Sequence, residues 1–138
     1  MASGVTVHSV CIEKFQGLKL RQDPRYIIYG LSKDLTEIVV HKTSSSSEYE
    51  DFCTDLPEYQ CAWAVYDLKY EDDAGNSRQK LVFFSWSPDD ARIKEKMIFA
   101  SSRDALRRAL VGVQFEIYAS ERSEVAYDAV IDKARHLR

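Results

Sequence analysis

The chain has 138 residues, of which 45% are hydrophobic and 12% aromatic, with a formal net charge of −3. This is enough for one folded domain with a real core, spanning residues 1–138, and it excludes an intrinsically disordered chain. The charge argues against indiscriminate nucleic-acid binding. The longest apolar run, Cys61 to Tyr66, is far shorter than the roughly 20 residues of a membrane helix, and the N-terminus lacks signal-peptide features. We therefore expect a soluble, intracellular protein.

Apolar residues at helical spacing predict a first amphipathic helix from Thr6 to Leu20, with Thr6 or Ser9 as its N-cap. Two runs rich in β-branched and aromatic residues follow, from Arg25 to Leu31 and from Thr36 to His41. Because a turn-like Ser32-Lys33-Asp34 separates these runs, they predict an antiparallel hairpin.

A short helix is expected from Ser47 to Leu56, because Pro57 cannot continue it. Two further runs, Cys61 to Tyr70 and Lys80 to Trp86, are rich in aromatic residues and valine. The polar segment from Glu71 to Ser77 joins them, and the three segments together predict a second hairpin with a long loop.

A long helix is expected from Ala91 to Leu110, which contains no proline or glycine, with Gly112 just past its end. The segment from Val113 to Ala119 predicts a last strand, and Ser123 to Leu137 predicts a last helix. A strand, a helix and a strand in succession normally place the two strands parallel. The expected fold is therefore an α/β sandwich, a mixed and mainly antiparallel sheet covered by helices.

Enzyme motifs are not convincing in this sequence. The histidines His8, His41 and His136 lie on three different elements, and no nucleophile elbow, phosphate loop or dinucleotide fingerprint occurs. The cysteines Cys11, Cys53 and Cys61 have neither zinc-site nor redox-pair spacing, so we expect reduced, partly buried thiols.

The predicted long helix carries the most informative charge pattern. From Arg92 to Arg108 there are six basic and two acidic residues, a local charge of +4, whereas Glu48 to Glu58 carries five acidic residues and no basic one. Its helical projection places four basic residues on the outer side, namely Lys96, Arg103, Arg107 and Arg108. Because Ile93, Met97 and Ala100 lie among them, the pattern favours a binding face over a merely solvated one.

The segment from Trp86 to Leu106, which reads WSPDDARIKEKMIFASSRDAL, resembles the signature of the ADF/cofilin family of actin-depolymerising proteins. The resemblance extends to MASGV at the N-terminus, to YEDF and LPE between Tyr49 and Glu58, to CAWAVYD from Cys61, and to SEVAY from Ser123. It implies the family fold, a single ADF-homology domain whose mixed sheet of five or six strands is sandwiched between helices.

The resemblance implies a protein that binds ADP-actin monomers and filament sides, severs filaments and promotes their depolymerisation, with no enzyme activity and no cofactor. It implies one surface for monomers and filaments, formed by Ser3, Gly4, Val5, Lys94, Lys96, Met97, Ser102, Arg103, Asp104, Arg107 and Arg108. It implies a second surface for filaments only, formed by Arg78, Lys80, Asp132, Lys133, Arg135 and His136.

The resemblance further implies regulatory phosphorylation of Ser3 and competition from phosphoinositides at the basic helix. We expect a cytoplasmic monomer associated with the actin cytoskeleton. Three alternatives stay open from the sequence: a coactosin-like or glia-maturation-factor-like relative that does not sever, a phosphoinositide-binding adaptor, and a small hydrolase.

A Ser3→Glu variant tests the phosphorylation hypothesis. A negative charge beside a basic binding surface opposes binding, so we expect actin affinity to fall several-fold. Filament pelleting measures the affinity, and thermal melting checks that the domain stays folded. An unchanged affinity would contradict the hypothesis.

Overall fold

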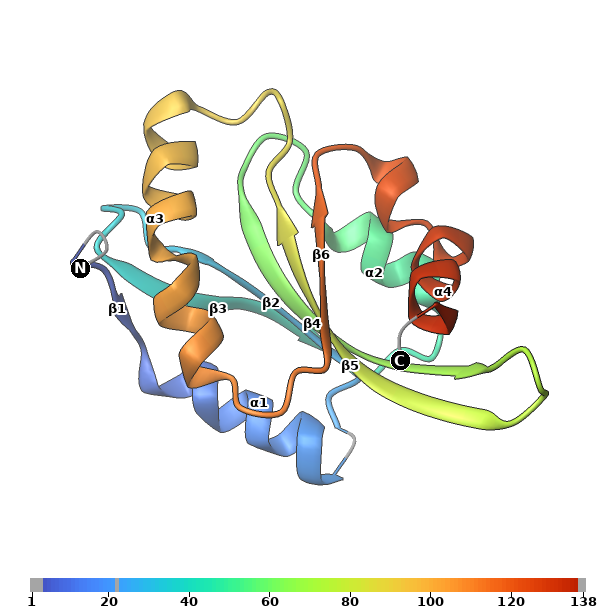
Figure 1. Ribbon diagram of the computed structural model, residues 1–138. Helices are drawn as coiled ribbons and strands as arrows, with labels where there is room; N and C mark the ends of the chain where they lie inside the picture. Colours follow the sequence, from blue (N-terminus) through green and yellow to red (C-terminus); the bar gives the residue numbers. More distant parts are fainter. Residues whose placement is uncertain (1–3, 22, 137–138) are drawn as a thin grey trace.

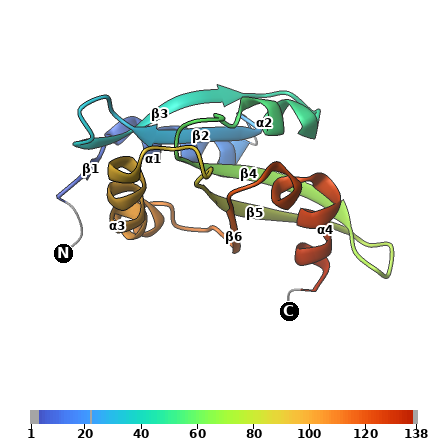
Figure 2. The ribbon, with the colours of Figure 1, turned by 90° about the horizontal axis from the view of Figure 1, so that it is seen from above.

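The computed structural model describes residues 4–21 and 23–136, which form a six-stranded sheet with helices against both faces (Figures 1 and 2). The strands are β1 (Thr6–Val7), β2 (Tyr26–Leu31), β3 (Glu37–Ser44), β4 (Ala62–Glu71), β5 (Ser77–Trp86) and β6 (Phe115–Ala119). The helices are α1 (Ser9–Arg21), α2 (Tyr49–Asp55), α3 (Ile93–Ala109) and α4 (Tyr127–Arg135), with a 3-10 turn at Arg122–Val125.

The strand order is β1-β3-β2-β4-β5-β6. The outer pairs β1–β3 and β5–β6 are parallel, whereas the three inner pairs are antiparallel. This confirms the predicted mixed, mainly antiparallel sheet covered by helices. It also confirms both predicted hairpins and the parallel crossover through α3.

Strand β4 is buried on both faces along most of its length, which explains its continuous apolar sequence. Successive side chains of a strand point to opposite faces. Trp63 and Val65 therefore pack on the side of α1 and α3, and Ala64 and Tyr66 pack on the side of α2 and α4. The alternation divides the interior into two core layers.

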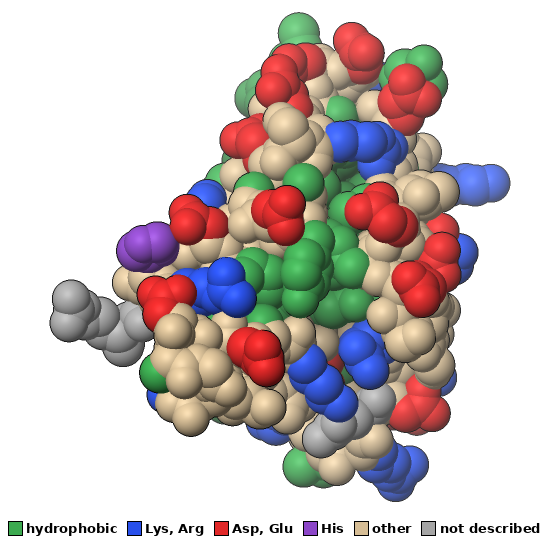
Figure 3. All heavy atoms as spheres, turned by 90° about the vertical axis from the view of Figure 1, so that its right-hand side faces the viewer, with side chains coloured by type: hydrophobic (Ala, Val, Ile, Leu, Met, Phe, Trp, Pro, Cys, Tyr) green, Lys and Arg blue, Asp and Glu red, His purple; other side chains and the backbone are tan. Residues whose placement is uncertain are grey.

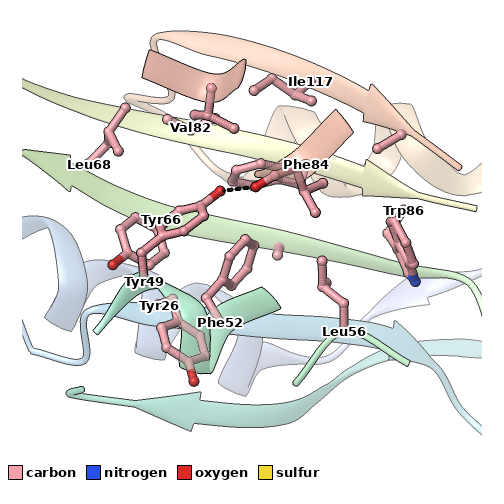
Figure 4. Close-up of a cluster of buried hydrophobic side chains, with 14 of the residues drawn as sticks. Tyr26, Tyr49, Phe52, Leu56, Tyr66, Leu68, Val82, Phe84, Trp86 and Ile117 are labelled. Carbon is pink, nitrogen blue, oxygen red and sulfur yellow. Dashed lines mark hydrogen bonds between the residues drawn. The ribbon is translucent and has the colours of Figure 1, made fainter. Parts of the chain in front are cut away.

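Aromatic rings fill the layer under α2 (Figure 4). Phe52 lies 4.9 Å from Phe84 and 5.2 Å from Tyr66, measured between ring centroids. The hydroxyl of Tyr49 donates a 2.6 Å hydrogen bond to the carbonyl of Val125. This bond ties α2 to the 3-10 turn that precedes α4.

The opposite layer holds α3 against the sheet. Phe99 stacks on Trp63 with ring centroids 4.2 Å apart, and Leu106 is fully buried two turns further along α3. Gly112 follows the helix with φ of 116°, a left-handed conformation that suits glycine after a helix end. The long helix was predicted within two residues at its start and one at its end.

The start of the first helix was predicted wrongly. Thr6 and Val7 form β1, which pairs parallel with β3, and the helix begins at Ser9. The backbone N–H of Val10 donates to Nδ1 of His8, so neither Thr6 nor Ser9 caps the helix. The sequence pattern misled because Val7 also fits the helical spacing of the residues that follow.

Further boundaries differ from the prediction, and β3 ends at Ser44, three residues past the predicted His41. The last helix is divided, because Ala126 has extended backbone angles (φ −59°, ψ 147°) between the 3-10 turn and α4. The predicted end at Leu137 lies outside the described residues. The loop of the second hairpin is shorter than predicted and comprises residues 72–76, since β5 begins at Ser77.

Candidate functional site

One side of α3 faces away from the sheet and mixes charged with apolar side chains. Its exposed residues recur at helical spacing, and we define the α3 stripe as six of them, Ile93, Lys94, Met97, Ser101, Asp104 and Arg108; Ala100 is exposed as well. Ile93 is 77% exposed and Met97 is 68% exposed, although both are large and apolar. Exposed apolar side chains surrounded by charge are typical of a surface that binds a protein partner.

Four residues of the predicted monomer surface lie elsewhere on α3, namely Lys96, Ser102, Arg103 and Arg107. Ser102 is fully buried. Arg103 and Arg107 both form ion pairs with Glu116 on β6, and the Arg107 Nε to Glu116 Oε2 distance is 3.1 Å. These arginines hold α3 to β6 with a large part of their charge neutralised. The projection that put them on the outer side with Arg108 was wrong, because a carboxylate on the neighbouring strand draws them inward.

Lys96 is half-buried beside the start of α3, and its Nζ donates a 2.8 Å hydrogen bond to the carbonyl of Asp89. Lys94, one position inside the helix, is exposed. Of this predicted lysine pair, only Lys94 extends fully into solvent, whereas Lys96 also stabilises the loop before α3.

The N-terminal segment lies beside α3, as Figure 1 shows for β1. Gly4 is exposed with φ of 80°, and Val5 is half-buried against the core layer of α1 and α3. The backbone N–H of Thr6 donates to the carbonyl of Thr36 and anchors the segment. Ser3 lies outside the described residues. The structure thus brings Gly4 and Val5 to the same side of the molecule as α3.

The residues of the predicted filament surface also come together, at the far end of the sheet. The Nε of Arg135 on α4 donates a 2.8 Å hydrogen bond to the carbonyl of Glu71, which holds α4 against the β4–β5 hairpin. Arg78 and Arg135 line one hollow of about 610 Å³ with Tyr70 and Tyr127. Figure 3 views this end of the molecule, where acidic and basic side chains surround an apolar centre.

The other members of this surface are close by on the same elements. Asp132, Lys133 and His136 are exposed on or just after α4, and Lys80 is half-buried on β5. We name the six residues together the hairpin surface: Arg78, Lys80, Asp132, Lys133, Arg135 and His136. The Asp132 carbonyl lies 2.7 Å from Nδ1 of His136, and this contact together with the Asp132 charge raises the pKa of His136.

A single carboxylate organises the hairpin loop. Asp72 accepts hydrogen bonds from Nε of Arg78 at 2.8 Å and from the backbone N–H groups of Ala74 and Asn76. The Arg78 bond, followed by these backbone bonds, lowers the pKa of Asp72 to about 2. Asp72 therefore fixes the guanidinium of Arg78 relative to the loop.

The three cysteines are free thiols, with Cys11 and Cys61 buried and Cys53 half-buried, as predicted. Burial raises the pKa of Cys11 and of Cys53 to about 11 in each case. Such thiols stay protonated at neutral pH, and protonated thiols are poor nucleophiles.

Two contributors escaped sequence reasoning. Glu116 pairs with Arg103 and Arg107 of α3, and Arg122 donates from Nη2 to the carbonyl of Leu56 at 2.8 Å while its guanidinium lies over the Trp86 ring. The partners of Glu116 and of Arg122 lie on other elements, so the residues next to them in the sequence do not predict these contacts. The alternation of β6 is the one available signal, because it places Glu116 on the α3 side of the sheet.

Within the described part of the chain, no cluster of three or more His, Cys, Asp or Glu side chains is placed to hold a metal ion. Over the same residues, none of the helices combines the length and apolarity needed to span a bilayer. The fold and the α3 stripe together are typical of a protein-binding domain.

Comparison with known proteins shows to which family of protein-binding domains the chain belongs. The profile of the family described as cofilin/tropomyosin-type actin-binding protein matches residues 4–135. A cofilin of Mycosarcoma maydis is 55% identical over 133 residues, covering 96% of each chain. The crystal structure of Streptomyces griseoflavus cofilin has a TM-score of 0.92 at 50% identity, covering 98% of this chain and 100% of that one.

A more distant structure has the same fold. Plasmodium berghei actin depolymerization factor 2 has a TM-score of 0.85 at 27% identity, covering 97% of both chains. The chain therefore belongs to the cofilin/ADF family, which is a family of actin-binding proteins and not of enzymes.

The low pKa of Asp72 gives a test of the hairpin loop. Because the folded state favours the carboxylate, its stabilising effect is complete above the ordinary aspartate pKa of about 4 and is lost as the pH falls through the folded value. In an Asp73→Asn background, which removes the carboxylate next to Ala74, we expect the amide NMR shifts of Ala74 and Asn76 to stay constant down to about pH 3. When Asp72→Asn is added to this background these shifts should not titrate, and a midpoint near 4 with Asp72 present would contradict the assignment.

Proposed function

We propose that this protein binds actin monomers and the sides of actin filaments through the α3 stripe together with Gly4, Val5 and Lys96. The observation that carries the proposal is the exposed mixture of Met97, Lys94 and Arg108 on a rigid helix. Lysine and arginine side chains would attract acidic groups of actin and raise the association rate. Met97 and Val5 would supply the apolar contacts at the centre of the interface.

The α3 stripe is supported by residues nearer the sheet, namely Ser102, Arg103 and Arg107. Ser102 is buried in the helix packing, and the two arginines are bound to Glu116. We assign them to the orientation of α3 relative to β6, and we assign Asp104, which is exposed and pairs with Arg103 at 2.7 Å, to the edge of the contact.

Filament binding would add the hairpin surface to the contact. The α3 stripe and the hairpin surface lie toward opposite ends of the molecule (Figure 1), a separation that suits contact with two neighbouring actin subunits at once. Asp72 and the Glu71 carbonyl hold Arg78 and Arg135 in place, so this surface is largely ordered before binding.

Severing would follow from differential affinity without any nucleotide hydrolysis by this protein. A ligand shifts a filament toward the state that it binds more tightly, here a more twisted, ADP-bound lattice, and boundaries between decorated and bare stretches become weak. Time-resolved imaging of single filaments tests this step. Breaks at such boundaries are expected, and decoration without internal breaks would contradict severing.

We further propose that the chain acts as one ADF-homology domain, as a cytoplasmic monomer on the actin cytoskeleton, and without catalytic activity or a cofactor. Phosphorylation of Ser3 would oppose binding by adding negative charge to the N-terminal part of a binding surface that depends on basic residues. Phosphoinositide headgroups would compete for Lys94 and Arg108. Size-exclusion chromatography with light scattering tests whether the protein is a monomer. Vesicle competition in actin pelleting tests whether phosphoinositides compete with actin.

Replacing Lys94 and Lys96 together with alanine tests the first surface. Losing two cations from one interface should weaken binding to monomers and filaments alike by at least about tenfold, or about 1.4 kcal/mol. Monomer fluorescence titration and filament pelleting measure the two affinities. A matched variant, Lys14→Ala with Lys42→Ala, removes two exposed lysines on α1 and β3 and should bind normally. Equal behaviour of the two variants would refute the assignment.

Replacing Arg78 and Lys80 with alanine tests the second surface. Filament binding should fall by about tenfold while monomer binding stays within about twofold, because the α3 stripe is untouched. The same two assays measure both quantities. Parallel losses in both assays would mean that the two surfaces do not act separately.

A further inference from the structure

A groove of about 480 Å³ opens between α3 and β6 beside the α3 stripe. Phe99 and Ala100 of α3 form one wall, and Tyr118 and Ala119 of β6 form the other. Tyr118 is 59% exposed although its ring lies under the guanidinium of Arg103 at 5.5 Å. These walls are apolar and aromatic with the cation of Arg103 beside them, and Ser87, Ser120 and Glu124 complete the lining.

The inner end of the groove is polar. Ser85 of β5 lines it and is only 6% exposed, yet its Oγ finds no hydrogen-bond partner among the described residues. Unsatisfied buried polar groups are unfavourable and uncommon, so this floor suits a ligand that brings its own polar atom.

The outer edge of β6 adds main-chain hydrogen-bonding groups to the groove. In a parallel pair, alternate residues bond to the neighbouring strand, and here the carbonyl of Ala119 accepts from the N–H of Ser87. The N–H and C=O groups of Glu116 and Tyr118 therefore face away from β5. Because β6 is the last strand of the sheet, no other described strand pairs with them (Figure 2).

We propose that an extended peptide from a partner protein adds to the free edge of β6 and places a tyrosine side chain in the groove. Alternate side chains of an added strand would point to the same face as Tyr118, toward α3. A tyrosine ring would fit the apolar walls and the guanidinium of Arg103, and its hydroxyl would be directed across β6 toward Ser85 of β5.

A peptide suits this edge better than a second copy of the domain. The edge strand lies between α3 and α4 (Figure 2), so pairing two copies would bring four helices together around two short strands. A single extended chain needs only the width of one strand.

The probes are two blocked nine-residue peptides, KTVTYTVTK and the same peptide with phenylalanine for tyrosine. Both read identically in either direction, so strand polarity does not affect the comparison. In NMR titrations with the full chain, we expect saturable shifts at residues 116–120, at Phe99 and at Ser85. The tyrosine peptide should bind at least about fivefold more tightly than the phenylalanine peptide, and Ser85→Ala should remove this preference.

Matched variants test separately how the groove and the strand edge contribute to peptide binding. Ala100→Leu fills the groove and should weaken binding at least about tenfold, whereas Ser101→Leu, its exposed neighbour on the α3 stripe, should not. Tyr118→Pro removes a free edge N–H and should bind more weakly than Tyr118→Thr, which keeps it. The amide signals of Ser87 and Ala119 check that the β5–β6 pair stays formed.

Three outcomes would overturn the proposal: no saturable shifts at these residues, equal affinity for both peptides in the wild type, or self-association through β6 that Tyr118→Pro abolishes. None of these measurements involves actin, so a failure here is distinguishable from a failure of the proposed function.

Discussion

Burial of β4 on both faces is the constraint on which the rest of the molecule depends. Its alternating side chains support α1 and α3 on one side and α2 and α4 on the other. Trp63 holds Phe99 of α3, while Tyr66 of the same strand holds the rings of α2. The α3 stripe and the hairpin surface are therefore both positioned by one strand, which exposes little of itself to solvent.

Polar contacts then decide which side chains remain available to a partner. Glu116 binds Arg103 and Arg107 and so leaves Arg108 as the exposed arginine of the second half of α3. At the other end of the sheet, Asp72 fixes Arg78 in a comparable way. Local positive charge in the sequence overstates the charge that a partner meets, because part of it is paired within the fold.

The β6 strand helps to position α3 and also contributes to a separate groove. It supplies Glu116 to the clamp on α3, and with Tyr118 it forms one wall of the groove that ends at Ser85. An edge strand that is short and carries a charged residue resists uncontrolled pairing, yet still offers a few main-chain groups to a specific peptide. The same strand can thus orient the actin-facing helix and provide a separate docking site.

The sequence by itself determined five of the six strands, β2 to β6, the long helix and the mixed sheet, because apolar periodicity and turn residues such as Pro57 and Gly112 act locally. The motif from Trp86 to Leu106 also identified the family. Only the tertiary structure decided that Thr6 and Val7 form a strand and that Ser102 is buried. It also decided which of the arginines are paired and where the groove lies, because these features depend on contacts between elements that sequence spacing does not encode.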